Sequence, residues 1–371
     1  MTTSKGLEGV IVAESDITSI IDDQLAYVGY NIDELVEQAS FEEVIYLLWH
    51  KRLPTQSELA EFSNKLFEEM ALPEQMLEHF KQMNLKEVHP MSALRTAISL
   101  LALYDSEADK IETEANFSKA IRLQARIASI ITTFARLRAG KELIKPKPNL
   151  GYAENFLYML KGSEVDPLEV EAFNKALVLH ADHELNASTF TARVCVATLS
   201  DLYSGLTAAI GALKGPLHGG ANEQVINMLM EIGEIDQAIP YIERKIANKE
   251  KIMGMGHRVY KTGDPRTKHL KEMAKKLSER AGQEKWYQIS VKIEDYIKRE
   301  KGLPANVDFY SASAYHSLGI DHDLFTPIFA MSRTSGWVAH MLEQYNNNRL
   351  IRPRAEYVGP ADQIYQPISN R

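Results

Sequence analysis

The chain has 371 residues, with 50 acidic and 42 basic side chains and a formal net charge of −8. This length allows two domains, and 45% hydrophobic with 25% charged residues is ordinary for a globular protein. The negative balance argues against a general binder of nucleic acid or anionic membranes. The single cysteine, Cys195, excludes an internal disulfide and any multi-cysteine metal site. Residues 1–15 carry no apolar secretory segment, and no apolar run approaches the roughly 20 residues of a membrane span, so we expect a cytoplasmic location.

Short β-favouring stretches near the N-terminus, at 9–13 and 25–30, predict a small strand pair. Beyond them, apolar residues recur at helical spacing, and the prolines at 146 and 148 predict a loop over 145–148. The tail from Asn346 onward reads as irregular. No alternation of long strands and helices is present, so the sequence predicts an all-α fold. Helices are expected over 41–49, 57–70, 92–104, 117–139, 168–184, 192–213, 223–232, 309–318 and 327–345, with one more starting at Pro265.

The segment 254–266 combines His257, the cations Arg258, Lys261 and Arg266, and flexible glycines. Asp264 is predicted as a helix N-cap with Pro265 at the first helical position. A helix N-terminus beside cations suits an anionic ligand, and a histidine can donate or accept a proton near neutral pH. The alternative is a solvated surface loop. The Gly-x-Gly portion is a weak dinucleotide signal, because no strand precedes it and the third glycine is missing.

A second histidine-containing segment spans 180–186. If it is helical, His180, His183 and Asn186 share one face. The alternatives are a packed histidine pair or a metal site. We predict no metal, because the segment does not match the His-Glu-x-x-His pattern of zinc hydrolases and no cysteine cluster exists.

Two further segments carry candidate catalytic groups. His218 lies in a glycine-rich turn before a helix, where the helix dipole favours a neutral histidine that donates a hydrogen bond. The alternative is a turn whose glycines serve only geometry. Asp308 reads either as the N-cap of the helix that follows it or as a desolvated carboxylate of raised basicity.

Taken together, these segments resemble the citrate synthase family over essentially the whole chain. The resemblance rests on Pro-Leu-His-Gly-Gly-Ala-Asn at 216–222, Gly-His-x-Val with Asp-Pro-Arg at 256–266, and Val-Asp-Phe-Tyr-Ser at 307–311, in that order and spacing. It is nearest to the short dimeric citrate synthases of Gram-positive bacteria. One departure is Met255, where the family usually carries an aromatic or small residue. Met is adaptable and apolar, so we expect a changed coenzyme contact and not a lost activity.

The resemblance implies an acyltransferase that condenses acetyl-CoA with oxaloacetate and hydrolyses citryl-CoA to citrate and CoA, the entry step of the tricarboxylic acid cycle. It implies no cofactor, since acetyl-CoA is a substrate. The near alternative is 2-methylcitrate synthase, which uses propionyl-CoA on the same fold. A non-catalytic helical scaffold and a metal hydrolase are alternatives from other classes, and the intact His218, His257 and Asp308 set argues against the scaffold.

The same resemblance assigns roles to individual residues. Asp308 removes a proton from the acetyl methyl group, His218 donates to the thioester oxygen, and His257 polarises and protonates the oxaloacetate carbonyl. The oxaloacetate-binding residues are His183, Arg266, Phe329, Arg333 and Arg352. The coenzyme A-binding residues are Ile252, Gly254, Met255 and Lys261, with Arg258 and Lys268 as less supported phosphate partners.

The implied architecture has a large helical domain, 1–218 with 314–371, and a small helical domain, 219–313. The family forms homodimers in which the C-terminal arginine, here Arg352, enters the partner's site. No nucleic-acid or membrane partner is expected.

Overall fold

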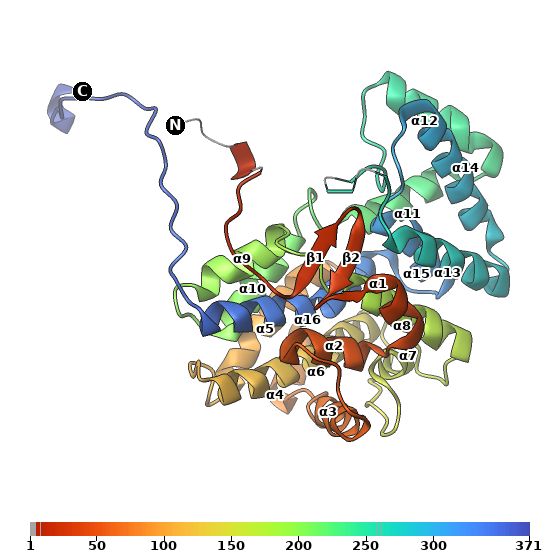
Figure 1. Ribbon diagram of the computed structural model, residues 1–371, viewed down its shortest axis with the longest axis horizontal. Coiled ribbons are helices and arrows are strands. Elements are labelled where there is room, and N and C mark those ends of the chain that lie inside the picture. Colours follow the sequence, from red (N-terminus) through yellow and green to blue (C-terminus); the bar gives the residue numbers. More distant parts are fainter. Residues whose placement is uncertain (1–4, 8, 258, 261) are drawn as a thin grey trace.

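The computed structural model describes residues 5–7, 9–257, 259–260 and 262–371. These residues form sixteen α-helices and one three-stranded sheet, which confirms the predicted all-α class with its small N-terminal strand element (Figure 1). Within the described residues no helix combines the length and apolarity that a membrane crossing requires. The helices are α1 (Ile32–Gln38), α2 (Phe41–His50), α3 (Gln56–Glu68), α4 (Glu74–Gln82), α5 (Pro90–Leu101), α6 (Thr113–Arg138), α7 (Tyr152–Lys161), α8 (Pro167–His180), α9 (Ala187–Val196), α10 (Leu202–Leu213), α11 (Ala221–Ile232), α12 (Ala238–Ala247), α13 (Arg266–Ala281), α14 (Glu284–Lys301), α15 (Val307–Ser317) and α16 (Phe325–Asn346).

The N-terminal sheet differs from its prediction. It is an antiparallel meander of β1 (Thr18–Ile21), β2 (Gln24–Tyr27) and β3 (Tyr30–Asn31). The first hairpin turns at Asp22 and Asp23, which both have positive φ, as a tight two-residue hairpin turn requires. The predicted strand at 9–13 is therefore wrong, because its place as the partner of the second strand is taken by residues 18–21 across this turn.

Helix α16 is the centre of the core. It contacts α2, α6, α8, α9 and α10, and nearly all of its side chains are buried. Its apolar residues belong to one hydrophobic cluster that also contains residues of β2 and every helix named here, with Ile20 of β1 packed against it. A helix that is buried on all sides makes a rigid support for side chains that project from it.

Local sequence signals explain several helix starts. Ser40 accepts from the backbone N–H of Glu43, and the Glu43 carboxylate accepts from the N–H of Ser40, so α2 begins with a capping box. The irregular segments agree with their predictions. The chain forms a loop over 145–148. The tail after α16 is irregular apart from one 3₁₀ turn (Ile368–Asn370).

Two predicted helices are shorter or divided. The helix predicted over 168–184 ends at His180, so His183 lies in a loop, and Asn186 instead caps α9. The shared helical face of His180, His183 and Asn186 is therefore wrong. The helix predicted over 192–213 is two helices, because Leu199 adopts a left-handed φ of 65° and the Asp201 side chain caps α10.

Helices α11 to α15 lie together on one side of the molecule (Figure 1). Within this group α13 packs on α15 and α14, and α11 packs on α15. Helix α15 starts at Val307, and its N-cap is Asn306, whose side chain accepts from the backbone N–H of Asp308. The N-cap reading of Asp308 is therefore wrong, and the carboxylate is free for another role.

Candidate active site

A short loop at 252–257 is joined to the segment that leads into α15. The backbone N–H of Asn306 donates to the carbonyl of Gly254 at 2.9 Å, and the N–H of Gly256 donates to the carbonyl of Pro304 at 2.7 Å. Gly254 has a φ of 77°, and a Cβ there would lie 2.8 Å from side-chain atoms of Phe309 and Val225. Only glycine allows this close approach, which brings the loop before His257 against the first turn of α15.

This loop forms one wall of an open cavity of about 730 Å³. Ile252, Gly254 and Met255 line it together with His218. Three of the four residues predicted to bind coenzyme A therefore share one cavity with a predicted catalytic histidine. The fourth, Lys261, lies outside the described residues, as does Arg258. Lys268 pairs with Asp33 at 2.6 Å.

Asp308 is the second residue of α15, and its side chain is partly buried. Its Oδ1 is buried and has no hydrogen-bond partner among the described residues. Burial raises the pKa of Asp308 to about 7, although Arg266 and Arg333 oppose the rise. The result is a carboxylate that is far more basic than an exposed one and has an oxygen available for a proton.

His218 is held in one tautomer. The backbone N–H of Ser188 donates to its Nε2 at 3.3 Å, and the Ser188 hydroxyl lies 2.8 Å from the same atom. A backbone N–H only donates, so Nε2 accepts and the proton of the neutral ring resides on Nδ1. Burial lowers the pKa of His218 to about 4, so the ring is neutral near pH 7. The sequence prediction of a neutral, donating histidine agrees with this geometry.

His257 is fixed by its own loop. Its Nδ1 accepts from the backbone N–H groups of Val259 at 3.0 Å and Tyr260 at 3.2 Å, so the proton resides on Nε2. Burial and the nearby Arg266 lower the pKa of His257. The ring centroid of His257 lies 5.3 Å from that of His183, whose Nε2 is 2.9 Å from the Tyr260 hydroxyl.

Two buried arginines supply positive charge to this region. Arg266 donates through Nε and Nη2 to the carboxylate of Asp264, at 2.9 and 2.8 Å. The Asp264 carboxylate also accepts from the backbone N–H of Arg266, as the side chain of an N-cap residue does. The helix α13 nevertheless begins at Arg266, with Pro265 in the N-cap position. The predicted start is thus displaced by one residue.

The second cation, Arg333, projects from α16. Its Nε donates to the carbonyl of His180 at 2.7 Å, and its guanidinium lies 4.7 Å from the ring centre of Phe329. Burial lowers the pKa of Arg333 to about 10. Burial, Arg266 and Arg333 all lower the pKa of His183, so these predicted oxaloacetate residues share one electrostatic neighbourhood.

Among the described residues, Arg352 is a predicted site residue that lies apart from the others in the single chain. It is exposed in the tail that extends away from the body (Figure 1). Two residues that sequence reasoning missed are Ser188 and Tyr260, which orient His218, His183 and His257. No sequence pattern links Ser188 to His218, because the two residues lie 30 positions apart.

Comparisons with known proteins identify the family of the chain. A family model described as the C-terminal domain of citrate synthase matches residues 6–354. Citrate synthase 2 of Bacillus subtilis is 66% identical over 371 residues, covering 100% of both chains. The 2-methylcitrate synthase 2 of Corynebacterium glutamicum is 41% identical, covering 99% of this chain and 97% of its own. A solved ternary complex of Thermoplasma acidophilum citrate synthase with carboxymethyl coenzyme A and oxaloacetate has a TM-score of 0.95 at 37% identity, covering 100% of both chains. By whole-chain identity, fold and matched family model, this chain belongs to the citrate synthase family and is an acyltransferase of that class.

Proposed function

We propose that Asp308, His218 and His257 carry the citrate synthase reaction of this chain, with acetyl-CoA and oxaloacetate as substrates. The observation that supports this most is the buried Oδ1 of Asp308, which has no hydrogen-bond partner in the described part of the chain, in a site where two neutral histidines each keep one ring proton. A base and two hydrogen-bond donors are the groups that an enolate condensation requires.

The first step is removal of a methyl proton from acetyl-CoA. A thioester methyl is a very weak acid, so the base must be strong and the oxyanion must be stabilised at once. Asp308, with its pKa of about 7, takes the proton. Nδ1–H of His218 donates to the thioester oxygen as it gains negative charge, and a donor of this kind is worth roughly 3–4 kcal/mol.

The second step forms the carbon–carbon bond. The enolate carbon attacks the ketone carbon of oxaloacetate, and the ketone oxygen becomes an alkoxide. Nε2–H of His257 polarises this oxygen and gives it the proton. Hydrolysis of the citryl thioester by water then releases citrate and CoA. The proton that this hydrolysis sets free restores Nε2–H of His257, and Asp308 returns its proton to solvent.

Oxaloacetate is a dianion and needs cations of fixed geometry. Arg266 is locked by Asp264, and Arg333 is anchored by the His180 carbonyl, so both guanidinium groups are preorganised. His183 can donate a ring N–H to the same anion, and the ring of Phe329 packs against the guanidinium of Arg333.

For coenzyme A, the proposed residues are Ile252, Gly254, Met255 and Lys261. Three of them line the large cavity, and the cations Lys249, Lys251 and Lys301 line it too, which suits a ligand with phosphate groups. The absence of a metal and of a further cofactor stays a prediction, as does the cytoplasmic location.

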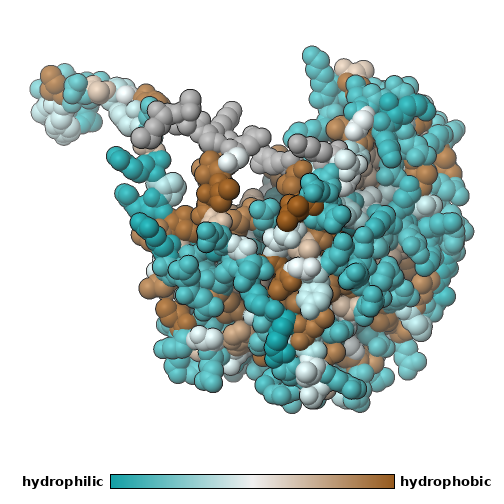
Figure 2. All heavy atoms as spheres, viewed as in Figure 1, coloured by the Kyte–Doolittle hydropathy of each residue, from teal (hydrophilic) through white to brown (hydrophobic). Residues whose placement is uncertain are grey.

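We further propose a homodimer in which Arg352 enters the partner's site. Large apolar side chains are exposed on both terminal segments: Val10, Ile11, Val12, Tyr357, Val358, Ile364, Tyr365 and Ile368. Figure 2 shows hydrophobic residues where these segments leave an otherwise largely hydrophilic face. A second copy would cover them. The division into a large domain and a small domain, 219–313, is kept as part of this proposal, and closure between the two would exclude water from the enolate.

Release of free CoA thiol tests the function directly. Acetyl-CoA and propionyl-CoA are each supplied with saturating oxaloacetate, and oxaloacetate is omitted as the control. We expect oxaloacetate-dependent thiol release and a higher kcat/KM for acetyl-CoA. A higher value for propionyl-CoA would make the chain a 2-methylcitrate synthase, and no release with either would refute the proposed reaction.

A further inference from the structure

The loop that carries His183 also carries a fully buried carboxylate. Asp182, next to His183 in residues 181–186, has no exposed surface. Its Oδ2 accepts from the hydroxyl of Thr18 at 2.6 Å and faces Nε2 of His340 at 3.1 Å. Its Oδ1 has no hydrogen-bond partner among the described residues. Burying a carboxylate costs free energy, because the charged group loses its hydration. A buried carboxylate of this kind therefore points to a role for its charge or its fixed geometry.

His340 is oriented to donate to this carboxylate. Nη1 of Arg193, which can only donate, lies 3.2 Å from Nδ1 of His340. Nδ1 therefore accepts, and the ring proton resides on Nε2, where it points at Asp182. Arg193 is itself held by Gln344 at 3.0 Å and by Glu343 at 2.5 Å. A chain of hydrogen bonds thus runs from the end of α16 to the His183 loop.

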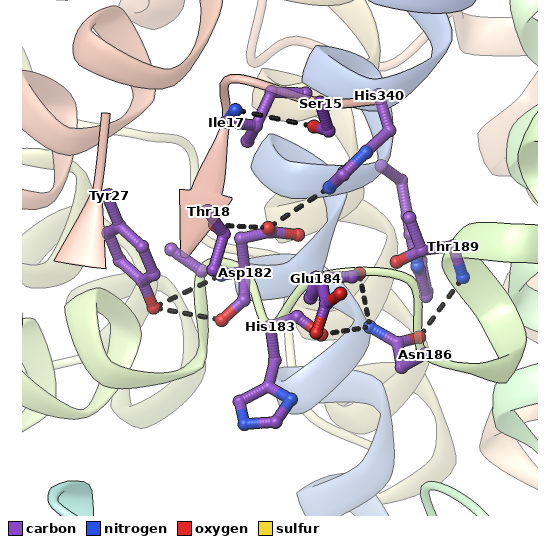
Figure 3. Close-up of polar contacts among 12 residues, drawn as sticks. Ser15, Ile17, Thr18, Tyr27, Asp182, His183, Glu184, Asn186, Thr189 and His340 are labelled. Carbon is purple, nitrogen blue, oxygen red and sulfur yellow. Dashed lines mark hydrogen bonds and ion pairs between the residues drawn. The ribbon is translucent and has the colours of Figure 1, made fainter. Parts of the chain in front are cut away.

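The loop backbone lies directly on α16. The N–H of Gly336 donates to the carbonyl of Ala181 at 3.1 Å, and the hydroxyl of Tyr27 donates to the carbonyl of Asp182 at 3.0 Å. A Cβ at Gly336 would lie 2.3 Å from Oδ1 of Asp182, so the contact leaves no room for a side chain. Figure 3 shows the Asp182 side chain turned toward Thr18 and His340, with the His183 ring on the opposite side of the loop. Fixing one side of the loop therefore fixes the other.

The charge of Asp182 also acts on the anion site. Burial by itself would raise the pKa of Asp182, but His340 and Arg333 bring it below its ordinary value. In return, Asp182 partly opposes the effect of burial on Arg333, which anchors the neighbouring carbonyl of His180. The carboxylate is thus a counter-charge behind a proposed oxaloacetate arginine.

We propose that Asp182 and His340 are a positioning pair for oxaloacetate, which hold residues 181–186 so that His183 and Arg333 present a preformed dicarboxylate site. Neither residue touches the substrate. The inference rests on the proposed function, since it takes His183 and Arg333 as oxaloacetate ligands.

The test uses three variants and one control. His340→Leu removes the N–H donor, His340→Gln keeps one, and Thr18→Val removes the second donor with little change of shape. Tyr345→Phe is the control, because its hydroxyl bonds to the carbonyl of Ser200 from the same helix, away from the loop. KM for oxaloacetate, KM for acetyl-CoA, kcat and the melting temperature are measured for each full-length protein.

We expect His340→Leu to raise KM for oxaloacetate about tenfold or more, since small displacements of positioning groups have effects of this size. Thr18→Val should raise it less, while KM for acetyl-CoA stays within about twofold of wild type for both, as expected for a site-local change. His340→Gln should recover most of the loss, and Tyr345→Phe should leave KM unchanged.

Folded His340→Leu and Thr18→Val proteins with a wild-type KM for oxaloacetate would overturn the inference. A lower melting temperature and kcat with unchanged KM would also overturn it, because the pair would then be purely structural. Should His340→Leu fail to fold, Thr18→Val decides. A wild-type protein that releases no CoA would refute the proposed function instead, and calorimetric titration of oxaloacetate into the same proteins would then test the pair independently.

Discussion

The backbone N–H of Ser188 donates to Nε2 of His218 at 3.3 Å, and this contact leaves the imidazole proton on Nδ1. A side-chain amide nitrogen in the place of Nδ1 can donate a hydrogen bond as Nδ1–H of His218 does. An amide nitrogen in the place of Nε2 would instead face the N–H of Ser188, and two donors cannot bond to each other. We therefore predict that His218→Asn, whose amide nitrogen can occupy the place of Nδ1, keeps more kcat than His218→Gln. Steady-state kinetics of the two variants test this prediction. A higher kcat for His218→Gln would show that the proton of His218 resides on Nε2 and not on Nδ1.

The loop at Gly254 gives a second prediction. Gly254→Ala places a Cβ 2.8 Å from Phe309 and Val225, so the cavity wall must move. KM for acetyl-CoA should rise about tenfold or more, in line with the cost of displaced binding groups. Gly282→Ala is the matched control, because Gly282 also has a positive φ, 63°, but open space around it. Equal KM values for acetyl-CoA in the two variants would show that Gly254 has no part in coenzyme binding.

The third prediction concerns pH. A base must be deprotonated to act, and burial raises the pKa of Asp308 to about 7. kcat/KM should therefore fall about tenfold per pH unit as pH drops below 7, and level off above it. His218, with its pKa lowered to about 4, stays neutral over that range and adds no second limb. A profile that is flat from pH 5 to 8 would contradict this basicity of Asp308.

How far the sequence leads can be seen at Asp308. Its motif pointed to a base, but its position before a helix equally indicated a cap, and only the backbone shows that Asn306 takes the cap. His183 was found by its motif, yet its helix ends at His180, because tertiary contacts and not local propensity hold the loop. The contacts of Ser188 and Asp182 join segments 30 and more than 150 residues apart, and no local pattern announces them.

The helical spacing of apolar residues predicts correctly which segments are helical, but it does not show where one helix ends and the next begins. The apolar pattern over 192–213 continues across a left-handed residue, Leu199, that divides α9 from α10. The strand at 9–13 was predicted from β-favouring residues, while the hairpin depends on two aspartates with positive φ. Both errors arise where a single backbone conformation outweighs the side-chain pattern.

The fourth prediction tests the proposed dimer. Arg352 lies in the extended tail, away from its own site (Figure 1). Homodimers of Arg352→Ala and of Asp308→Ala should each be nearly inactive. A heterodimer of the two should contain one doubly damaged site and one with all native groups, so subunit exchange should restore up to about half of the activity per dimer, since independent sites add. Confirmed heterodimers without recovery would place Arg352 outside the partner's site.

The central claim is that Asp308 is the base, and Asp308→Asn tests it most directly. The amide has nearly the same shape but accepts no methyl proton, so kcat should fall by at least about 100-fold. Stability should not suffer. Because the folded-state pKa of Asp308 is raised, its ionisation costs the native state stability above the unfolded pKa, and the neutral variant should melt no lower than wild type at pH 8. A folded variant with a melting temperature at or above that of wild type and kcat reduced at least about 100-fold is the predicted result; the same protein with near-wild-type kcat would contradict it.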